Sequence, residues 1–131
     1  VAWNQRALFF DYKPKLIDKN VDVILIENPV APDVRPENLE DKTLYLACGE
    51  LKGGIDPAGA DEHWKTAGSA LERIRDCFGR RCPKLFFAAS AIEQAMAKEI
   101  YTQLKTEKLT HAANLTAEKQ LEDLANWLTS L

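Results

Sequence analysis

Residues 21–26 constrain the fold of this chain more than any other segment. They read Val-Asp-Val-Ile-Leu-Ile and are followed by Asn28-Pro29, which is the pattern of a short buried strand ended by a turn. Asp22 is the exception in this apolar run. A carboxylate in a buried strand costs several kcal/mol unless a cation or a hydrogen-bond donor meets it. The segment therefore predicts both a central strand and a partner for Asp22 that comes from elsewhere in the chain.

A second strand is predicted at residues 43–52 (TLYLACGELK), ended by two glycines. Glu50 and Lys52 are two positions apart, so they point to the same face of this strand. The same alternation places three apolar side chains on that face: Leu44, Leu46 and Cys48. If the two strands are neighbours, Asp22, Glu50 and Lys52 come together at one edge of the sheet.

The remaining segments predict helices around a small sheet. Helices are expected at residues 3–12, 62–78, 90–106 and 117–130. The second of these stops at Gly79, and the third opens with a capping-box pair, Ser90 and Glu93. A third strand is expected at residues 84–89 and a proline-rich surface loop at residues 28–42. This order predicts an α/β fold with a small mixed central sheet flanked by helices.

The length and composition are those of one folded domain spanning residues 1–131. Hydrophobic residues make up 46% of the chain and charged residues 28%, which argues against a disordered chain. The longest apolar run, residues 23–26, is too short for a membrane span or a signal peptide. Three cysteines are too few and odd in number for a disulfide framework, so we expect a reducing, cytoplasmic compartment. The chain begins at Val1 without an initiator methionine, which suggests a piece of a longer protein.

The net charge of −3 is unevenly distributed. Residues 1–62 hold 7 Lys and Arg against 12 Asp and Glu, whereas residues 63–84 hold 6 against 2. An acidic first half does not suit a nucleic-acid coat protein, which is basic overall, but it suits a site that gathers carboxylates around a cation. The basic stretch includes Arg80, Arg81 and Lys84. It is a candidate contact for a polyanion, and the alternative is a solvated helix face and turn.

Asp22 and Glu50 would repel each other at one edge of a sheet. A hard divalent cation with oxygen ligands removes that conflict. Beside the cation, the ammonium of Lys52 would attract an anionic substrate or orient the attacking water. This set of groups suits metal-assisted hydrolysis of a phosphodiester, in which the metal holds hydroxide and neutralises charge in the transition state.

Asp22 followed 28 residues later by Glu-x-Lys at a strand end resembles the PD-(D/E)xK nucleases. A longer stretch is more specific, because residues 49–66 (GELKGGIDPAGADEHWKT) resemble the catalytic segment of the type II restriction endonucleases of the AvaI/BsoBI group. In that group the metal-binding Asp lies 28 residues before the Glu, as Asp22 does before Glu50. A His lies 11 residues beyond the Lys, as His63 does beyond Lys52.

The resemblance implies a PD-(D/E)xK restriction-endonuclease-like core and assigns roles to individual residues. Asp22 and Glu50 are implied as ligands of Mg²⁺, with the Leu51 backbone carbonyl as a third. Lys52 and His63 are implied as catalytic residues beside them. The resemblance further implies a bacterial, cytoplasmic homodimer that cuts double-stranded DNA at the palindrome CYCGRG and leaves 5′-phosphates. It implies neither a nucleotide cofactor nor a membrane partner.

Two features depart from the pattern of that group. Val21 replaces the Pro of the PD motif, which removes a turn-forming residue but no ligand. The chain is also much shorter than whole enzymes of the group, so it resembles their catalytic C-terminal part. If the protein binds DNA, Arg80, Arg81 and Lys84 are expected to contact the phosphate backbone, because nothing near them indicates insertion into a groove.

Other interpretations of these residues stay open. Asp22 is alternatively a structural acid held by Asn20 or by a backbone N–H. Lys52 is alternatively a surface lysine at a strand end, and His63 a residue that only packs on the turn before it. For the whole protein, the alternatives are another PD-(D/E)xK nuclease, of DNA repair or junction resolution, and a non-catalytic interaction domain that keeps the nuclease fold.

Overall fold

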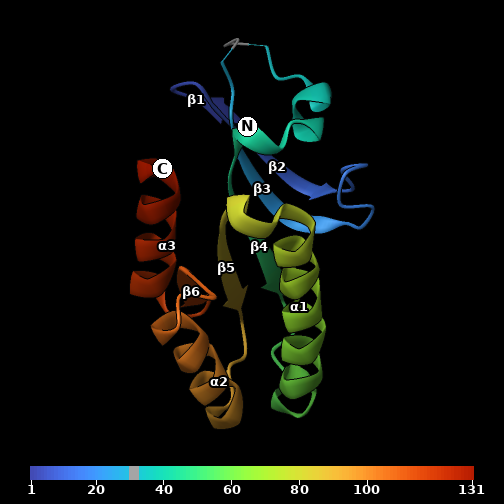
Figure 1. Cartoon of the computed structure of the whole chain (residues 1–131). Coiled ribbons are helices and arrows are strands. Elements are labelled where there is room, and N and C mark those ends of the chain that lie inside the picture. The colour runs from blue at the N-terminus through green and yellow to red at the C-terminus, as the bar shows by residue number, and fades with distance from the viewer. Residues whose placement is uncertain (30–32) are drawn as a thin grey trace.

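The computed structural model describes residues 1–29 and 33–131 and has a six-stranded mixed sheet flanked by three helices (Figure 1). The strands are β1 (Ala2–Trp3), β2 (Arg6–Tyr12), β3 (Val21–Glu27), β4 (Tyr45–Lys52), β5 (Lys84–Ala89) and β6 (His111–Asn114). The helices are α1 (Pro57–Phe78), α2 (Gln94–Lys105) and α3 (Glu118–Ser130), with 3-10 turns η1 (Pro36–Glu40), η2 (Lys42–Leu44) and η3 (Gly79–Arg81). The predicted α/β class, a mixed sheet flanked by helices, is confirmed.

The strands lie in the sheet in chain order, from β1 to β6. The pairs from β1 to β4 are antiparallel, and β4, β5 and β6 pair in parallel. Parallel neighbours need a crossover connection, which α1 supplies between β4 and β5. Figure 1 shows α1 and α3 on opposite sides of the sheet, so both faces of its parallel part are covered. This explains why β5, KLFFAA, is almost continuously apolar.

Two segments before β4 differ from the sequence prediction. The helix predicted at residues 3–12 is wrong, because this segment forms β1 and β2, joined by a turn at Asn4-Gln5. Both turn residues have positive φ, 41° and 61°, as tight hairpin turns require. β2 pairs with β3 along its length, and this pairing overrides the local helical pattern. The predicted loop at residues 28–42 contains η1, and its residues 30–32 lie outside the described part of the chain.

The long helix begins earlier than predicted, at Pro57 instead of residue 62. Asp56 caps it, since the Ala58 N–H donates a hydrogen bond to the Asp56 side chain at 3.0 Å. A proline in the first turn loses no intrahelical hydrogen bond, which also favours a start at this point. The helix stops as predicted at Gly79, whose φ of 57° is easily adopted only by glycine.

The C-terminal third contains a strand that the sequence pattern does not predict. β6 extends the sheet beside β5, and its four residues are too few to establish an alternation. α2 begins at Gln94 with Glu93 as its N-cap, so the cap predicted at Ser90 is wrong. The last predicted helix is confirmed as α3, with Leu124 buried. Leu121, three residues before Leu124 on the same helix, is exposed.

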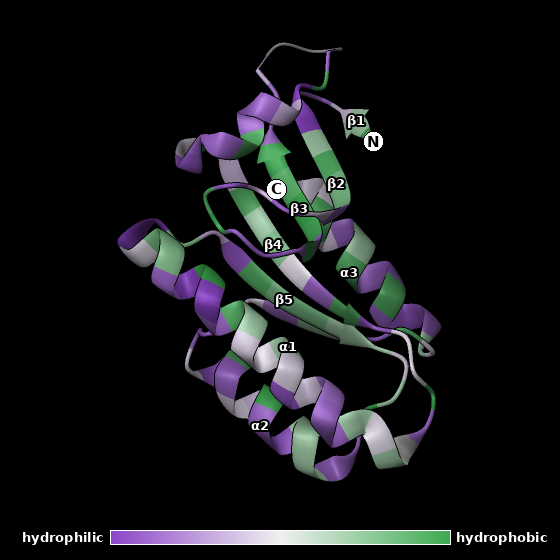
Figure 2. Ribbon diagram, turned by 90° about the vertical axis from the view of Figure 1, so that its right-hand side faces the viewer, coloured by the Kyte–Doolittle hydropathy of each residue, from purple (hydrophilic) through white to green (hydrophobic). Residues whose placement is uncertain are grey.

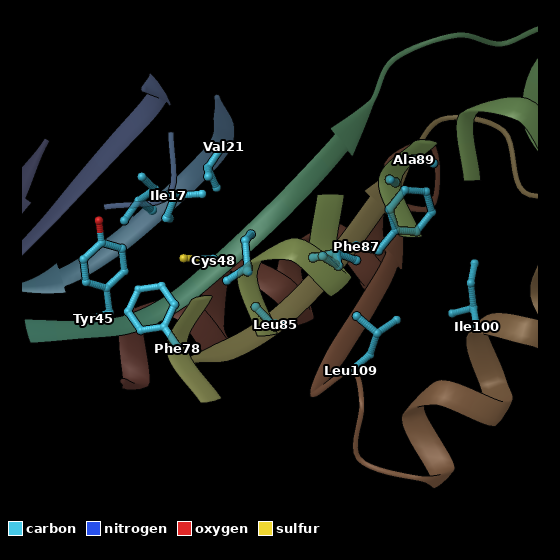
Figure 3. Packing of buried hydrophobic residues seen from close by; sticks show 14 of the residues in the cluster. Ile17, Val21, Tyr45, Cys48, Phe78, Leu85, Phe87, Ala89, Ile100 and Leu109 are labelled. Atoms are coloured by element: carbon cyan, nitrogen blue, oxygen red, sulfur yellow. The ribbon is translucent and has the colours of Figure 1, made fainter. Parts of the chain in front are cut away.

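The core occupies both faces of the sheet, and Figure 2 shows hydrophobic residues concentrated on the strands. Side chains of β5 alternate between two hydrophobic clusters. Leu85, Phe87 and Ala89 belong to the larger cluster, which includes residues of α1 and α2. Phe86 and Ala88 belong to the smaller cluster, which includes residues of α3. Figure 3 shows part of the larger cluster, where Phe78 packs on Tyr45. In the described residues no helix is long and apolar enough to cross a membrane.

Candidate active site

Asp22, Glu50 and Lys52 lie together at one end of the β3–β4 pair. The two strands are antiparallel, with Ile24 opposite Cys48, so the first residues of β3 lie beside the last residues of β4. The Lys52 Nζ lies 3.6 Å from Glu50 Oε2 and 3.8 Å from Asp22 Oδ2. Both distances exceed those of direct hydrogen bonds. The ammonium therefore stands between the two carboxylates as a counter-charge, and within the described residues its N–H groups are free for a further acceptor.

The carboxylate of Asp22 is held by the backbone of the neighbouring strand. The Leu51 N–H donates a hydrogen bond to Asp22 Oδ2 at 2.6 Å. Asn20, the alternative partner suggested by the sequence, donates its Nδ2 to Asp11 Oδ1 at 2.8 Å. Because the N–H and C=O of an extended residue point to the same side of the strand, the Leu51 carbonyl also faces Asp22. The N–H thus fixes one carboxylate oxygen of Asp22, Oδ2.

Glu50 is the buried carboxylate of the site. Only 4% of the residue is exposed, and its Oε1 is buried without a hydrogen-bond partner within the part of the chain that the structure describes. Phe87 lies beside it in the parallel register, and Trp64 packs edge-on against Phe87 with ring centroids 5.1 Å apart. Desolvation, and then the charge of Asp22, raise the pKa of Glu50 to about 7, while Lys52 lowers it in part. A bound cation would give Glu50 Oε1 a partner and so offset the free-energy cost of burying this oxygen.

His63 lies in the second turn of α1, with its ring against the loop that follows β4. A Cβ atom added to Gly54 would lie 2.9 Å from His63 Cε1. Gly54 is two residues beyond Lys52, so this contact places the imidazole near the end of β4 that carries the carboxylates. His63 is exposed, whereas its neighbour Trp64 is buried and donates its Nε1–H to Glu99 of α2 at 2.5 Å. The His63 side chain therefore lies at the surface, whereas Trp64, the next residue, lies in the core.

The structure does not bring the predicted DNA-backbone contacts to this site. Arg80 and Arg81 follow the last residue of α1, whose 22 residues span about 33 Å. Lys84 opens β5 and, because β4 and β5 are parallel, lies near the start of β4 rather than at the end that carries Lys52. All three basic residues are exposed. Contact with DNA by these residues stays a prediction, and it would occur at the far end of α1 from the carboxylates.

The oxygen atoms at the carboxylate end fit a hard divalent cation. Asp22 and Glu50 offer carboxylate oxygens, and the Leu51 carbonyl offers a third oxygen on the same side. Among the described residues, no group of three or more His, Cys, Asp or Glu side chains could hold a metal. Two carboxylates are nevertheless enough for Mg²⁺, because this ion usually keeps several waters and binds substrate phosphates together with one or two carboxylates.

Two residues that support the site have little or no signal in the sequence. Gly54 belongs to a pair of glycines that would end any strand, and its contact with His63 depends on the turn between β4 and α1. Glu99 has the pattern of a surface residue on α2, yet it joins this helix to α1 through Trp64. The only signal for Gly54 is its position directly after the strand that carries the charged pair.

Comparison with known proteins shows similarity along the whole chain. A sequence model of the family described as "Restriction endonuclease BsobI" matches residues 1–131. The chain is 44% identical over 140 residues to the type II restriction enzyme AvaI of Nostoc sp. and 45% identical over 139 residues to the type II restriction enzyme BsoBI of Geobacillus stearothermophilus. These alignments include 100% of this chain but 43% and 42% of the relatives, so the chain spans less than half of their length.

Proposed function

Because the chain belongs to the BsobI restriction endonuclease family, we propose that it is the catalytic part of a type II site-specific deoxyribonuclease. One observation carries the proposal: Glu50 is buried with an unpartnered carboxylate oxygen, among the described residues, beside Asp22 and Lys52. Burying such a group costs stability unless a cation compensates it. The restriction-endonuclease-like fold supports the proposal, because its sheet carries these residues to the end of β4.

In this proposal Asp22, Glu50 and the Leu51 carbonyl hold a divalent metal ion, with Mg²⁺ as the ion in the cell. When bound, such an ion lowers the pKa of a water molecule and neutralises charge on the phosphodiester. The Leu51 N–H keeps the carboxylate of Asp22 turned toward β4. Packing of Phe87 beside Glu50 excludes water from the inner side of that carboxylate, so its charge acts on the bound cation with little screening.

Lys52 and His63 have other tasks in the proposed reaction. An ammonium cannot ligate a cation, but Lys52 can donate hydrogen bonds to a phosphate oxygen and stabilise the negative charge that develops there. His63 is proposed to accept a proton from the attacking water, because an imidazole exchanges protons near neutral pH and its ring lies at the end of β4. Each residue thus acts on a different atom of the reaction.

We further propose double-stranded DNA as the substrate, CYCGRG as the recognition sequence and 5′-phosphate ends as the product. The names of the relatives, each a type II restriction enzyme, support the class of substrate. The recognition sequence and the product ends rest on the resemblance of residues 49–66 to that group. A homodimer follows from a palindromic target, since two-fold symmetry presents a second site to the second strand. Free cysteines and bacterial relatives support the bacterial cytoplasm.

Incubation of the protein with plasmid DNA and Mg²⁺, with and without EDTA, tests the proposal. Discrete fragments whose ends fall in a single sequence, and which disappear with EDTA, would support it. A metal-dependent smear would favour a repair or junction nuclease of the same fold. Binding of DNA without cleavage would favour a non-catalytic interaction domain. The Glu50→Gln variant, purified in the same way, controls for contaminating nucleases.

A further inference from the structure

The imidazole of His63 lies between two glycines, one in the loop after β4 and one in the first turn of α1. A Cβ atom added to Gly54 would lie 2.9 Å from Cε1 and 3.4 Å from Nδ1 of this ring. A Cβ atom added to Gly59 would lie 3.7 Å from Cε1 and 3.9 Å from Nε2. The second set of distances is ordinary van der Waals contact, whereas the first includes an overlap. The ring therefore leaves room for a side chain at Gly59 but not at Gly54.

The neighbouring Gly53 provides a contrast on the same loop. A Cβ atom added there would meet nothing within 4 Å. Neither Gly53 nor Gly54 has a positive φ, since among the described residues Gly79 is the glycine with positive φ. The overlap that a side chain at Gly54 would meet therefore comes from the His63 ring and not from a positive φ.

Hydrogen bonds hold both ends of the loop that contacts the ring. The loop consists of residues 53–56. At one end the Ser90 N–H donates a hydrogen bond to the Lys52 carbonyl at 2.9 Å. At the other end Asp56 caps α1 through the Ala58 N–H. A methyl group at Gly54 would overlap with the His63 ring, and rotation of the exposed His63 side chain would relieve this overlap at the lowest cost.

We propose that Gly54 is the positioning residue for His63: its bare Cα lets the imidazole lie against the loop, next to the strand that carries Glu50 and Lys52. This inference rests on the proposed function in so far as His63 takes part in cleavage. In this proposal Gly54 acts only through the ring that it contacts. A displacement of about 1 Å in a catalytic group can lower a rate by about a hundredfold.

NMR of the histidine rings tests the contact without any need for activity. The sequence contains two histidines, so the His63 and His111 ring signals are assigned by one substitution. In the parent protein we expect a nuclear Overhauser effect between the His63 Hε1 and the Gly54 Hα protons. Gly54→Ala should shift the His63 signals and leave those of His111 in place, whereas the matched control Gly53→Ala should shift neither. Unchanged His63 signals in Gly54→Ala would overturn the inference.

Cleavage rates then test whether the contact matters for catalysis. Gly54→Ala should lower the rate by at least about tenfold, and Gly53→Ala by less than about twofold. In a His63→Ala background, Gly54→Ala should have less than about a twofold further effect, because the ring on which it acts is gone. An equal loss in both backgrounds would overturn the positioning role. A parent protein that does not cleave DNA would count against the proposed function, while the NMR comparison still decides the contact.

Discussion

Charged groups of different kinds lie near the two ends of α1, and they differ in how deeply they are buried. Next to its first turn, Asp22, Glu50 and Lys52 form a half-buried cluster in which a Glu50 oxygen lacks a partner among the described residues. Beyond its last turn, Arg80 and Arg81 are exposed to solvent. The first arrangement costs stability and the second is nearly neutral. The difference supports the proposal that chemistry belongs to the carboxylate end and, at most, substrate binding to the basic end.

Other basic groups near the end of α1 already have structural partners. Arg75 pairs with Glu72 and donates a hydrogen bond to the Lys108 carbonyl at 2.9 Å. Lys42 donates a hydrogen bond to the Cys77 carbonyl at 2.7 Å. Cations at the C-terminal end of a helix also interact favourably with its dipole. Hydrogen bonds and the helix dipole therefore account for positive charge at this end of α1. At the other end, the buried Glu50 Oε1 has no such partner among the described residues.

Removal of a carboxylate should have the largest effect on activity. Asp22→Asn and Glu50→Gln each remove one ligand charge while the shape of the side chain is kept, so the cleavage rate should fall by at least about a thousandfold. Rates on plasmid DNA measure the effect, and circular dichroism checks that the variants fold. Parental cleavage by either variant would contradict the assignment of these residues as metal ligands.

Replacement of Lys52 should separate catalysis from metal binding. Lys52→Ala should lower the cleavage rate by about two to three orders of magnitude, because a donor to the anionic transition state is lost. Mg²⁺ affinity should stay equal or rise, since an ammonium repels the metal. Calorimetric titration with Mg²⁺ measures this affinity, and much weaker binding by the variant would show that Lys52 is structural.

His63→Ala should have a smaller but clear effect. Loss of a general base lowers the cleavage rate by at least about a hundredfold, while binding of DNA and metal should change little. The dependence of the cleavage rate on pH should also differ from that of the parent, because the variant lacks the proposed proton acceptor. If the variant cleaves at nearly the parental rate with an unaltered pH dependence, His63 only packs against the loop.

The smallest effect is expected at the basic end of α1. Replacement of both Arg80 and Arg81 by Ala should weaken specific and non-specific DNA binding by similar factors, of about tenfold at most. It should also reduce the slope of log affinity against log salt by about two. Binding titrations over a range of salt concentrations measure both quantities. A changed sequence preference would mean that these residues contact bases, and the basic end would then contribute more than steering.

Local alternation predicted the charged pair of β4, and Asp22 joins it because β3 and β4 pair, as the sequence analysis assumed. Glu50 and Lys52 share a face because strands have a period of two, and Asp22 stands out because it interrupts an apolar run. The contact of His63 with Gly54 could not be predicted in the same way. It depends on where α1 begins, at Pro57 rather than residue 62, and therefore on a loop conformation that no periodicity encodes.

Long amphipathic patterns and apolar strands also predicted most of the fold, whereas its short strands were not predicted. Residues 2–12 form strands because β3 supplies the partner for their hydrogen bonds, and β6 forms because β5 does. Neither segment has an alternation long enough to reveal this by itself. Short strands toward the two sides of the sheet are set by tertiary pairing, which a single sequence does not display.

The proposed function requires that the fold bury Glu50 at a cost in stability and that a bound metal ion offset this cost. The pKa of Glu50 is raised from its ordinary value of 4.5 to about 7. A carboxyl group with a raised pKa stabilises the fold when protonated, and this contribution is lost as the pH rises from about 4.5 through 7. In Glu50→Gln the uncharged group removes this dependence, so the variant serves as the reference.

The most direct test is the unfolding free energy of the parent and of Glu50→Gln between pH 4.5 and pH 8, with and without Mg²⁺. Without metal, the parent should lose up to about 3 kcal/mol relative to the variant as the pH rises. Saturating Mg²⁺ should restore stability to the parent at pH 8 and affect the variant little. If the unfolding free energies of the two proteins change with pH in parallel, and Mg²⁺ does not stabilise the parent, the proposed role of Glu50 in metal binding is contradicted.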